Sequence, residues 1–254
     1  MRFLLVFLVA LADFAAAQET CIEAPYDIAQ EAPQRELVAL YAEISTAWVR
    51  FPSLAETMEA RKPQLCLASR MDGAHGSFDV DRNRIYISED LESDMKLGVL
   101  LHEIRHLNQF SIGACPSDDL AMEEYALATF ALEADASAIS LLIAWDMKEQ
   151  GNARAWSALS AWDTQSDIAD RFAEEMEASG SVEAAVSAAF DQWFTSESRR
   201  ESYYQSVCSG YLDRQDASKS LPRYQLIPAD FYAELCRLPD GTSYQCSEPM
   251  LQAR

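Results

Sequence analysis

The sequence predicts a single α+β domain with a small β-sheet in its N-terminal half and a mainly helical C-terminal half. Between Pro63 and Ser88, apolar residues fall in short extended stretches bounded by turn residues. After Ser93 they recur at the spacing of helices. The 254 residues contain no internal repeat and no low-complexity linker, and 49% of them are hydrophobic, which is enough for a full core.

The first residues have the pattern of a secretory signal. Arg2 precedes an apolar stretch, and small residues ending at Ala17 resemble a signal peptidase site. We therefore expect residues 1–17 to be a signal peptide, residues 18–254 to form the single domain, and the protein to be periplasmic or secreted. No later segment has about twenty uncharged apolar residues, so the sequence predicts no membrane span.

The elements can be predicted in chain order. Apolar residues from Gln34 to Phe51 fall on one helical face, and Pro52 ends this pattern. Three extended pieces follow, over 64–68, 77–80 and 84–88. The sequence Asp81-Arg82-Asn83 is the natural turn between the last two.

The remaining pattern is helical. Ser93 or Asp94 can cap a helix that ends near Gly113. Further helices are expected over 120–148, 153–178 and 182–212. Beyond Pro222 the chain is rich in proline and cysteine, and we expect a disulfide-stapled extension there.

Six cysteines follow the predicted signal, and an even number in an oxidising compartment predicts three disulfides. Cys236 and Cys246 flank the turn sequence Pro239-Asp240-Gly241, so we expect these two to pair. The other four can pair in three ways, which the sequence leaves open: Cys21, Cys66, Cys115 and Cys208.

The clearest functional pattern is an H-E-x-x-H motif, His102 to His106, in the helix after Ser93. Two histidines four residues apart lie on one helical face, so both can bind one metal ion. Glu103 is then placed to accept a proton from a metal-bound water. The apolar residues gather on the opposite face, which can pack in the core: Leu97, Leu100, Leu101, Ile104 and Leu107.

A catalytic zinc ion needs a third protein ligand. The segment 132–136, with the sequence L-E-A-D-A, offers two acids on the next helix. Here the chain resembles the gluzincin branch of the zincin metallopeptidases, in which a glutamate on a later helix completes H-E-x-x-H. It also resembles secreted bacterial metallopeptidase-like proteins with the patterns L-x-H-E-x-R-H-x-x-Q, here 100–109, and E-A-D-A, here 133–136.

The resemblance implies a zincin-like fold, Zn²⁺ as cofactor, and a role for four residues. His102, His106 and Glu133 would be the metal ligands, and Glu103 the general base. The resemblance also implies a strand along the cleft, whose free edge holds an extended substrate, and 84–88 occupies that place in the sequence.

Asp135 is the alternative third ligand. Glu133 and Asp135 are about 200° apart around a helix, so both cannot point at one metal ion. Asp135 shares its side with other acids, which is typical of a solvated stripe, whereas Glu133 has small and apolar neighbours. We therefore prefer Glu133, with Asp135 as an outer contact or a surface residue.

Other residues are candidates to stabilise a transition state. His75 could be an oxyanion donor, an alternative ligand or an ordinary loop residue. Arg105 is expected at the shoulder of the cleft or on the surface. Tyr86 and Tyr125 are possible hydrogen-bond donors, and nothing in the sequence distinguishes them.

The sequence thus predicts an exported zinc metalloendopeptidase that hydrolyses peptide or protein substrates with a water activated by Glu103. A net charge of −21 excludes an electrostatic grip on nucleic acid or on an anionic membrane. The alternative is a non-catalytic exported binding or envelope protein that keeps a zincin scaffold. A chance motif in a helical protein would predict no bound metal.

Overall fold

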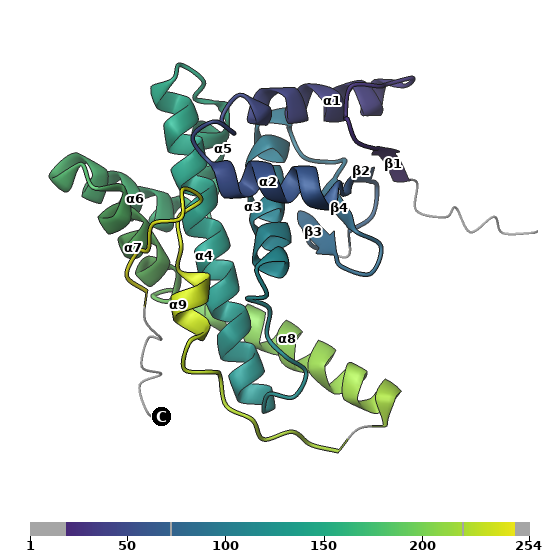
Figure 1. Ribbon diagram of the computed structural model, residues 1–254, viewed down its shortest axis with the longest axis vertical. Helices are drawn as coiled ribbons and strands as arrows, with labels where there is room; N and C mark the ends of the chain where they lie inside the picture. The colour runs from purple at the N-terminus through teal and green to yellow at the C-terminus, as the bar shows by residue number, and fades with distance from the viewer. Residues whose placement is uncertain (1–18, 72, 220, 247–254) are drawn as a thin grey trace, which may run out of the picture.

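The computed structural model describes residues 19–71, 73–219 and 221–246, and the predicted signal peptide, 1–17, lies outside them. Figure 1 shows a small sheet packed beside a larger helical body, which confirms the α+β class. The described elements are β1 (Glu19–Ile22), α1 (Ala32–Ser45), α2 (Pro52–Arg61), β2 (Gln64–Ala68), β3 (Gly76–Asp79), β4 (Arg84–Ser88), α3 (Ser93–Ser111), α4 (Met122–Glu149), α5 (Arg154–Ala161), α6 (Ser166–Ser179), α7 (Val182–Trp193), α8 (Glu197–Ser218) and α9 (Phe231–Leu235).

The sheet has the strand order β1-β2-β4-β3. β4 pairs in parallel with β2 and antiparallel with β3, so it lies inside the sheet. The expectation that 84–88 forms the free edge is therefore wrong. The edge strand on that side is β3. It begins and ends one residue earlier than the strand predicted over 77–80. Ile85 and Ile87 are fully buried, which suits an internal strand.

One predicted helix ends earlier than expected, and two others are each divided in two. The first ends at Ser45, and Pro52 begins α2 instead of ending a helix. Proline suits the first helical position because its missing N–H group would have no intrahelical partner there. The helix predicted over 153–178 breaks between α5 and α6, and that predicted over 182–212 breaks between α7 and α8.

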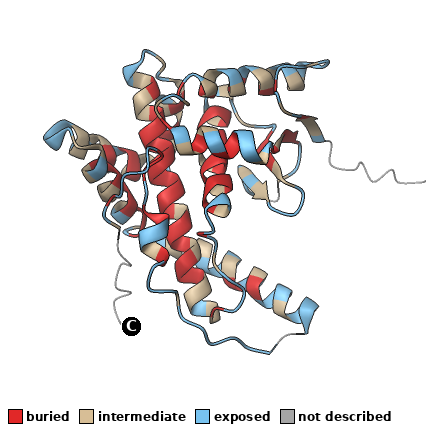
Figure 2. Cartoon of the chain, viewed as in Figure 1, coloured by how far each residue is buried: buried red, intermediate tan, exposed pale blue. Residues whose placement is uncertain are grey.

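The core is centred on α3 and α4, which pack against each other and carry more buried residues than any other pair of elements (Figure 2). The predicted apolar face of α3 is confirmed, because its five residues are all fully buried. Among the described residues, α4 alone is long and apolar enough to cross a membrane by length and composition. However, 89% of the apolar 18-residue stretch within this helix is buried in the fold, as in a core helix.

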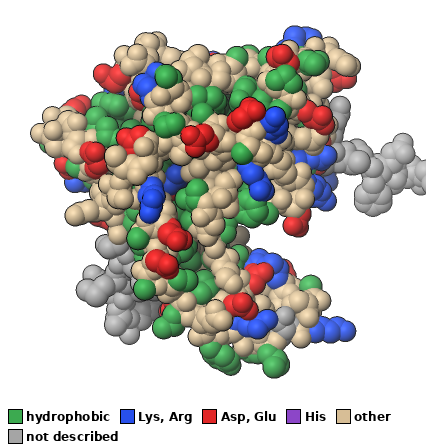
Figure 3. Space-filling model, viewed as in Figure 1, with side chains coloured by type: hydrophobic (Ala, Val, Ile, Leu, Met, Phe, Trp, Pro, Cys, Tyr) green, Lys and Arg blue, Asp and Glu red, His purple; other side chains and the backbone are tan. Residues whose placement is uncertain are grey.

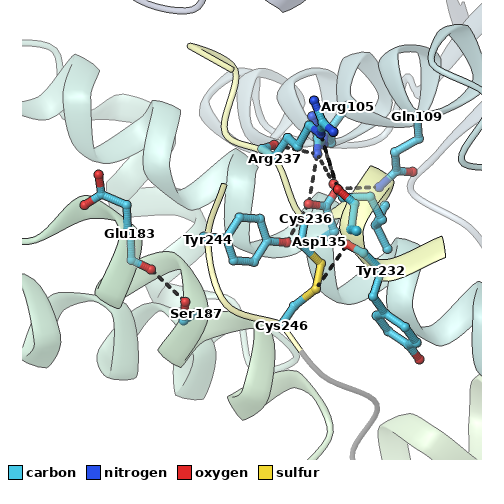
Figure 4. Close-up of a disulfide and its surroundings, with 12 residues drawn as sticks. Arg105, Gln109, Asp135, Glu183, Ser187, Tyr232, Cys236, Arg237, Tyr244 and Cys246 are labelled. Carbon is cyan, nitrogen blue, oxygen red and sulfur yellow. Dashed lines mark hydrogen bonds and ion pairs between the residues drawn. A yellow bond between two sulfur atoms is a disulfide. The ribbon is translucent and has the colours of Figure 1, made fainter. Parts of the chain in front are cut away.

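Two disulfides are present among the described residues. The predicted Cys236–Cys246 pair is confirmed, and it closes the C-terminal segment shown in Figure 4. Cys21 pairs with Cys66, across neighbouring strands β1 and β2. Cys115 and Cys208 are free, so the expectation of three disulfides is wrong. An even number of cysteines does not by itself bring every pair of sulfur atoms within bonding distance.

Candidate metal centre

His102, His106 and Glu133 meet where α3 packs against α4. Their nearest ligand atoms all lie within 4.8 Å of one another. The two histidine Nε2 atoms are 2.9 Å apart. Glu133 Oε2 is 3.4 Å from His102 Nε2, and its Oε1 is 3.4 Å from His106 Nε2. The structure thus brings together the three residues that the sequence singled out as ligands.

These residues fit a zinc ion in both chemistry and spacing. Two imidazoles and one carboxylate are a usual catalytic donor set for zinc, and they leave a fourth position for water. Tetrahedral coordination at ordinary zinc–ligand distances separates the ligand atoms by about 3.3 Å. The observed separations of 2.9 to 3.4 Å are close to this value.

The electrostatics of the group favour a positive charge at its centre. Burial raises the pKa of Glu133, but His106 and His102 lower it more, so the net pKa is well below its usual range. Burial lowers the pKa of His106, but Glu133, with smaller contributions from Glu103 and Gln109, raises it to about 9. In the metal-free protein, the additional proton on the His106 ring supplies the positive charge that a metal ion would otherwise bring to the group.

Glu103 lies beside the histidines and under the edge strand. Its side chain is buried, and burial raises its pKa, with a smaller opposing effect of His106 and His102. A Cβ atom on Gly76 of β3 would lie 2.6 Å from Glu103 Oε1 and 2.5 Å from Val99 Cγ1. Only glycine therefore lets the strand backbone approach this carboxylate so closely.

Tyr203 is a site residue that the sequence analysis missed. It lies on α8, and its hydroxyl donates a hydrogen bond of 3.0 Å to Glu133 Oε2. The charge of Glu133 and, second, burial raise the pKa of Tyr203, so its hydroxyl stays protonated. No motif marks this tyrosine, because α8 reaches the site only through the tertiary packing against α4.

The other predicted transition-state donors are not at the metal centre. Tyr86 lies near Arg84 and Glu19, on the sheet. The ring of Tyr125 packs 5.5 Å from that of Tyr211. Neither lines the cavity at the histidines. His75 is exposed at its rim.

The metal centre opens into a cavity of about 890 Å³. Its walls come from β3 and the loop before it, from α3 and α4, from the connection between α5 and α6, and from α8. Figure 3 shows the surface hollowed between the upper body and the lower part that carries α8. Apolar side chains line part of it: Phe78 on β3, Val80 directly after β3, Phe110 on α3 and Leu132 on α4.

Arg105 and Asp135 form a buried ion pair away from the ligand atoms. Arg105 Nε lies 2.6 Å from Asp135 Oδ2, and its Nη2 lies 2.9 Å from Oδ1. Both side chains are at most 1% exposed. The expectations of Arg105 at the cleft shoulder or surface and of Asp135 on a solvated stripe are therefore wrong. Each charge is buried because the other, with further hydrogen bonds, replaces the lost water.

Comparison with known proteins agrees with this geometry. No curated protein and no solved structure matches the chain. A family model described as "Putative metallopeptidase family (DUF6782)" matches residues 15–246, which includes every residue of the centre described above. Because this match extends over most of the chain, the protein belongs to that metallopeptidase family.

Proposed function

We propose that the protein is an exported zinc-dependent metalloendopeptidase. The observation that carries this proposal is the convergence of His102, His106 and Glu133 beside the buried carboxylate of Glu103 at one cavity. Membership of a metallopeptidase family supports the reaction class.

The two histidines and Glu133 would hold the metal ion. When bound, a zinc ion polarises the scissile carbonyl and lowers the pKa of water. The chain contributes the arrangement of these ligands on two packed helices, which keeps the separations of their atoms nearly constant.

Glu103 is the proposed general base. It accepts a proton from the attacking water and returns it to the leaving amine. Burial favours this exchange, because a carboxyl group whose pKa is raised holds the transferred proton more readily than an exposed one.

Tyr203 is proposed to stabilise the transition state. Its hydroxyl lies at Glu133 and lines the cavity, where it can donate a hydrogen bond to the oxygen that gains negative charge at the scissile carbonyl. In the resting site the same hydroxyl holds the carboxylate of Glu133 in place.

The substrate is proposed to be an extended segment of a peptide or protein. β3 pairs with β4 on one side, and residues of β3 line the cavity. An extended peptide can add to such an edge by main-chain hydrogen bonds. The two disulfides agree with an oxidising compartment and hence with export.

Metal analysis and one substitution test the proposal together. The purified mature protein should contain about one equivalent of zinc, which His102→Ala should remove. Glu103→Ala should abolish peptide hydrolysis while zinc content and fold are retained. If the zinc-loaded protein hydrolyses no peptide and Glu103→Ala changes nothing that can be measured, the protein is instead a non-catalytic binding protein. A preparation that resists zinc loading would contradict the proposed metal site.

A further inference from the structure

His106 has one ring nitrogen at the proposed metal position and the other at Gln109. Its Nε2 atom faces His102 and Glu133, and its Nδ1 atom lies 2.8 Å from Gln109 Oε1. A neutral imidazole carries its proton on one nitrogen only, and the nitrogen that binds metal must be the other one. The partner of Nδ1 therefore decides whether Nε2 is available to a metal ion.

The orientation of the Gln109 amide follows from its two other contacts. Its Nε2 atom lies 2.9 Å from the carbonyl oxygen of Leu132 and 2.7 Å from Asp135 Oδ2. The carbonyl oxygen of Leu132 can only accept a hydrogen bond, so the NH₂ group of the amide must face it and the neighbouring Asp135 carboxylate. Oε1 then faces His106 as an acceptor, and Nδ1 must be the nitrogen that donates.

Asp135 is in turn held by the C-terminal segment 235–246, which the Cys236–Cys246 disulfide closes. The hydroxyl of Tyr244 donates to Asp135 Oδ1 at 2.7 Å. Arg105 pairs with the same carboxylate, and its Nη2 atom also donates to the carbonyl oxygens of Leu235 and Arg237, both at 3.0 Å. Figure 4 shows these side chains meeting at Asp135.

We propose that Gln109 is a positioning residue that fixes the tautomer of His106, and that segment 235–246 holds it in place through Asp135. The inference rests on the proposed metal site. It makes the C-terminal segment a supporting part of that site, although none of its residues is a proposed ligand. Gln109 and Asp135 are fully buried, so no water competes for these hydrogen bonds.

Gln109→Met tests the first link, because methionine has nearly the same shape and cannot accept the Nδ1 proton. Zinc affinity, measured by competition with a chelator, should fall by roughly 10- to 100-fold. The ¹⁵N shifts of the His106 ring in the zinc-loaded protein should change from a protonated Nδ1 to a mixture of bound forms.

Gln109→Glu separates positioning from stability. The carboxyl group can still accept from Nδ1, but it also approaches the charge of Asp135 and should lower the free energy of unfolding more than methionine does. We expect this variant to be the less stable one and to keep the ¹⁵N signature of the wild type. If Gln109 served only to stabilise the fold, the less stable variant, Gln109→Glu, would instead show the larger change in the ¹⁵N shifts of the His106 ring.

Tyr244→Phe tests the link to segment 235–246, and Tyr211→Phe is its matched control. Each removes one buried tyrosine hydroxyl, and that of Tyr211 donates to the carbonyl oxygen of Leu120 at 2.9 Å. Zinc affinity should fall in Tyr244→Phe only. Equal losses of zinc affinity in both tyrosine variants, or wild-type zinc affinity in Gln109→Met, would overturn this inference but leave the proposed function standing. A wild type without zinc binding would overturn the proposed function and this inference together.

Discussion

Glu133 and Asp135 are two residues apart on α4 and have opposite surroundings. Glu133 faces His102 and His106 at the cavity, whereas Asp135 is fully buried against Arg105 and Gln109. Both acids thus lie against the same helix, but one is placed to bind a metal ion and the other neutralises a buried guanidinium. Their substitutions should therefore have different consequences.

We expect Glu133→Gln to lose zinc and to destabilise the metal-free protein moderately at neutral pH, because protonated His106 loses the carboxylate that raises its pKa. Asp135→Asn should leave Arg105 buried without a counter-charge and lower the free energy of unfolding by roughly 3–5 kcal/mol. Zinc content and urea unfolding of the metal-free variants measure the two effects. Complete loss of zinc in a folded Asp135→Asn variant, with zinc kept in Glu133→Gln, would reverse the assignment.

Glu103→Gln should reduce peptide hydrolysis by at least about 100-fold, because the amide cannot accept the proton of the attacking water. Zinc affinity should change little, since Glu103 is not a proposed ligand. The measurement is kcat on a quenched fluorescent peptide library, with zinc content determined on the same samples. Residual activity near the wild-type level would remove Glu103 as the base.

Gly76→Ala should lower kcat, because the added Cβ would push on Glu103 Oε1 and Val99 Cγ1. A displacement of about 1 Å at a catalytic group can cost roughly 100-fold in rate. Gly210→Ala is the control, because its Cβ would meet nothing closer than 3.5 Å on helix α8. Unchanged kinetics in Gly76→Ala would show that the strand can yield without moving the carboxylate.

Tyr203→Phe should lower kcat by roughly 100- to 1,000-fold, the usual effect of removing one hydrogen-bond donor to a developing oxyanion. Zinc should be retained, although the carboxylate of Glu133 loses a partner. Tyr125→Phe is the matched control, since Tyr125 does not line the cavity. A rise in KM with kcat unchanged, or an equal effect of the control, would contradict a role of Tyr203 in the transition state.

Peptide mapping without reduction should find the linkages Cys21–Cys66 and Cys236–Cys246. Alkylation of the folded protein should modify Cys115, which is exposed, whereas Cys208 should react only after unfolding because it is buried. Mass spectrometry of digests before and after denaturation makes the comparison. A Cys115–Cys208 linkage would contradict the two free thiols.

The sequence by itself determined the features that depend on neighbours along the chain. The spacing of His102 and His106 follows from the helical repeat, as does the burial of the leucine face of α3. The Cys236–Cys246 pair follows from a turn between the two cysteines. The preference for Glu133 over Asp135 used the same helical geometry, and the structure places Glu133 at the histidines.

Only the tertiary structure decided which distant segments meet. A five-residue strand pattern does not say how many neighbouring strands the strand will pair with. In the folded sheet, β4 lies inside and β3 at the edge. Helical angles alone placed Asp135 on an acidic stripe, but the approach of Arg105 and Tyr244 makes its burial possible. Tyr203 reaches Glu133 across 70 residues of chain. Such contacts depend on how whole helices pack against one another, and the residue pattern within a single segment does not predict that packing.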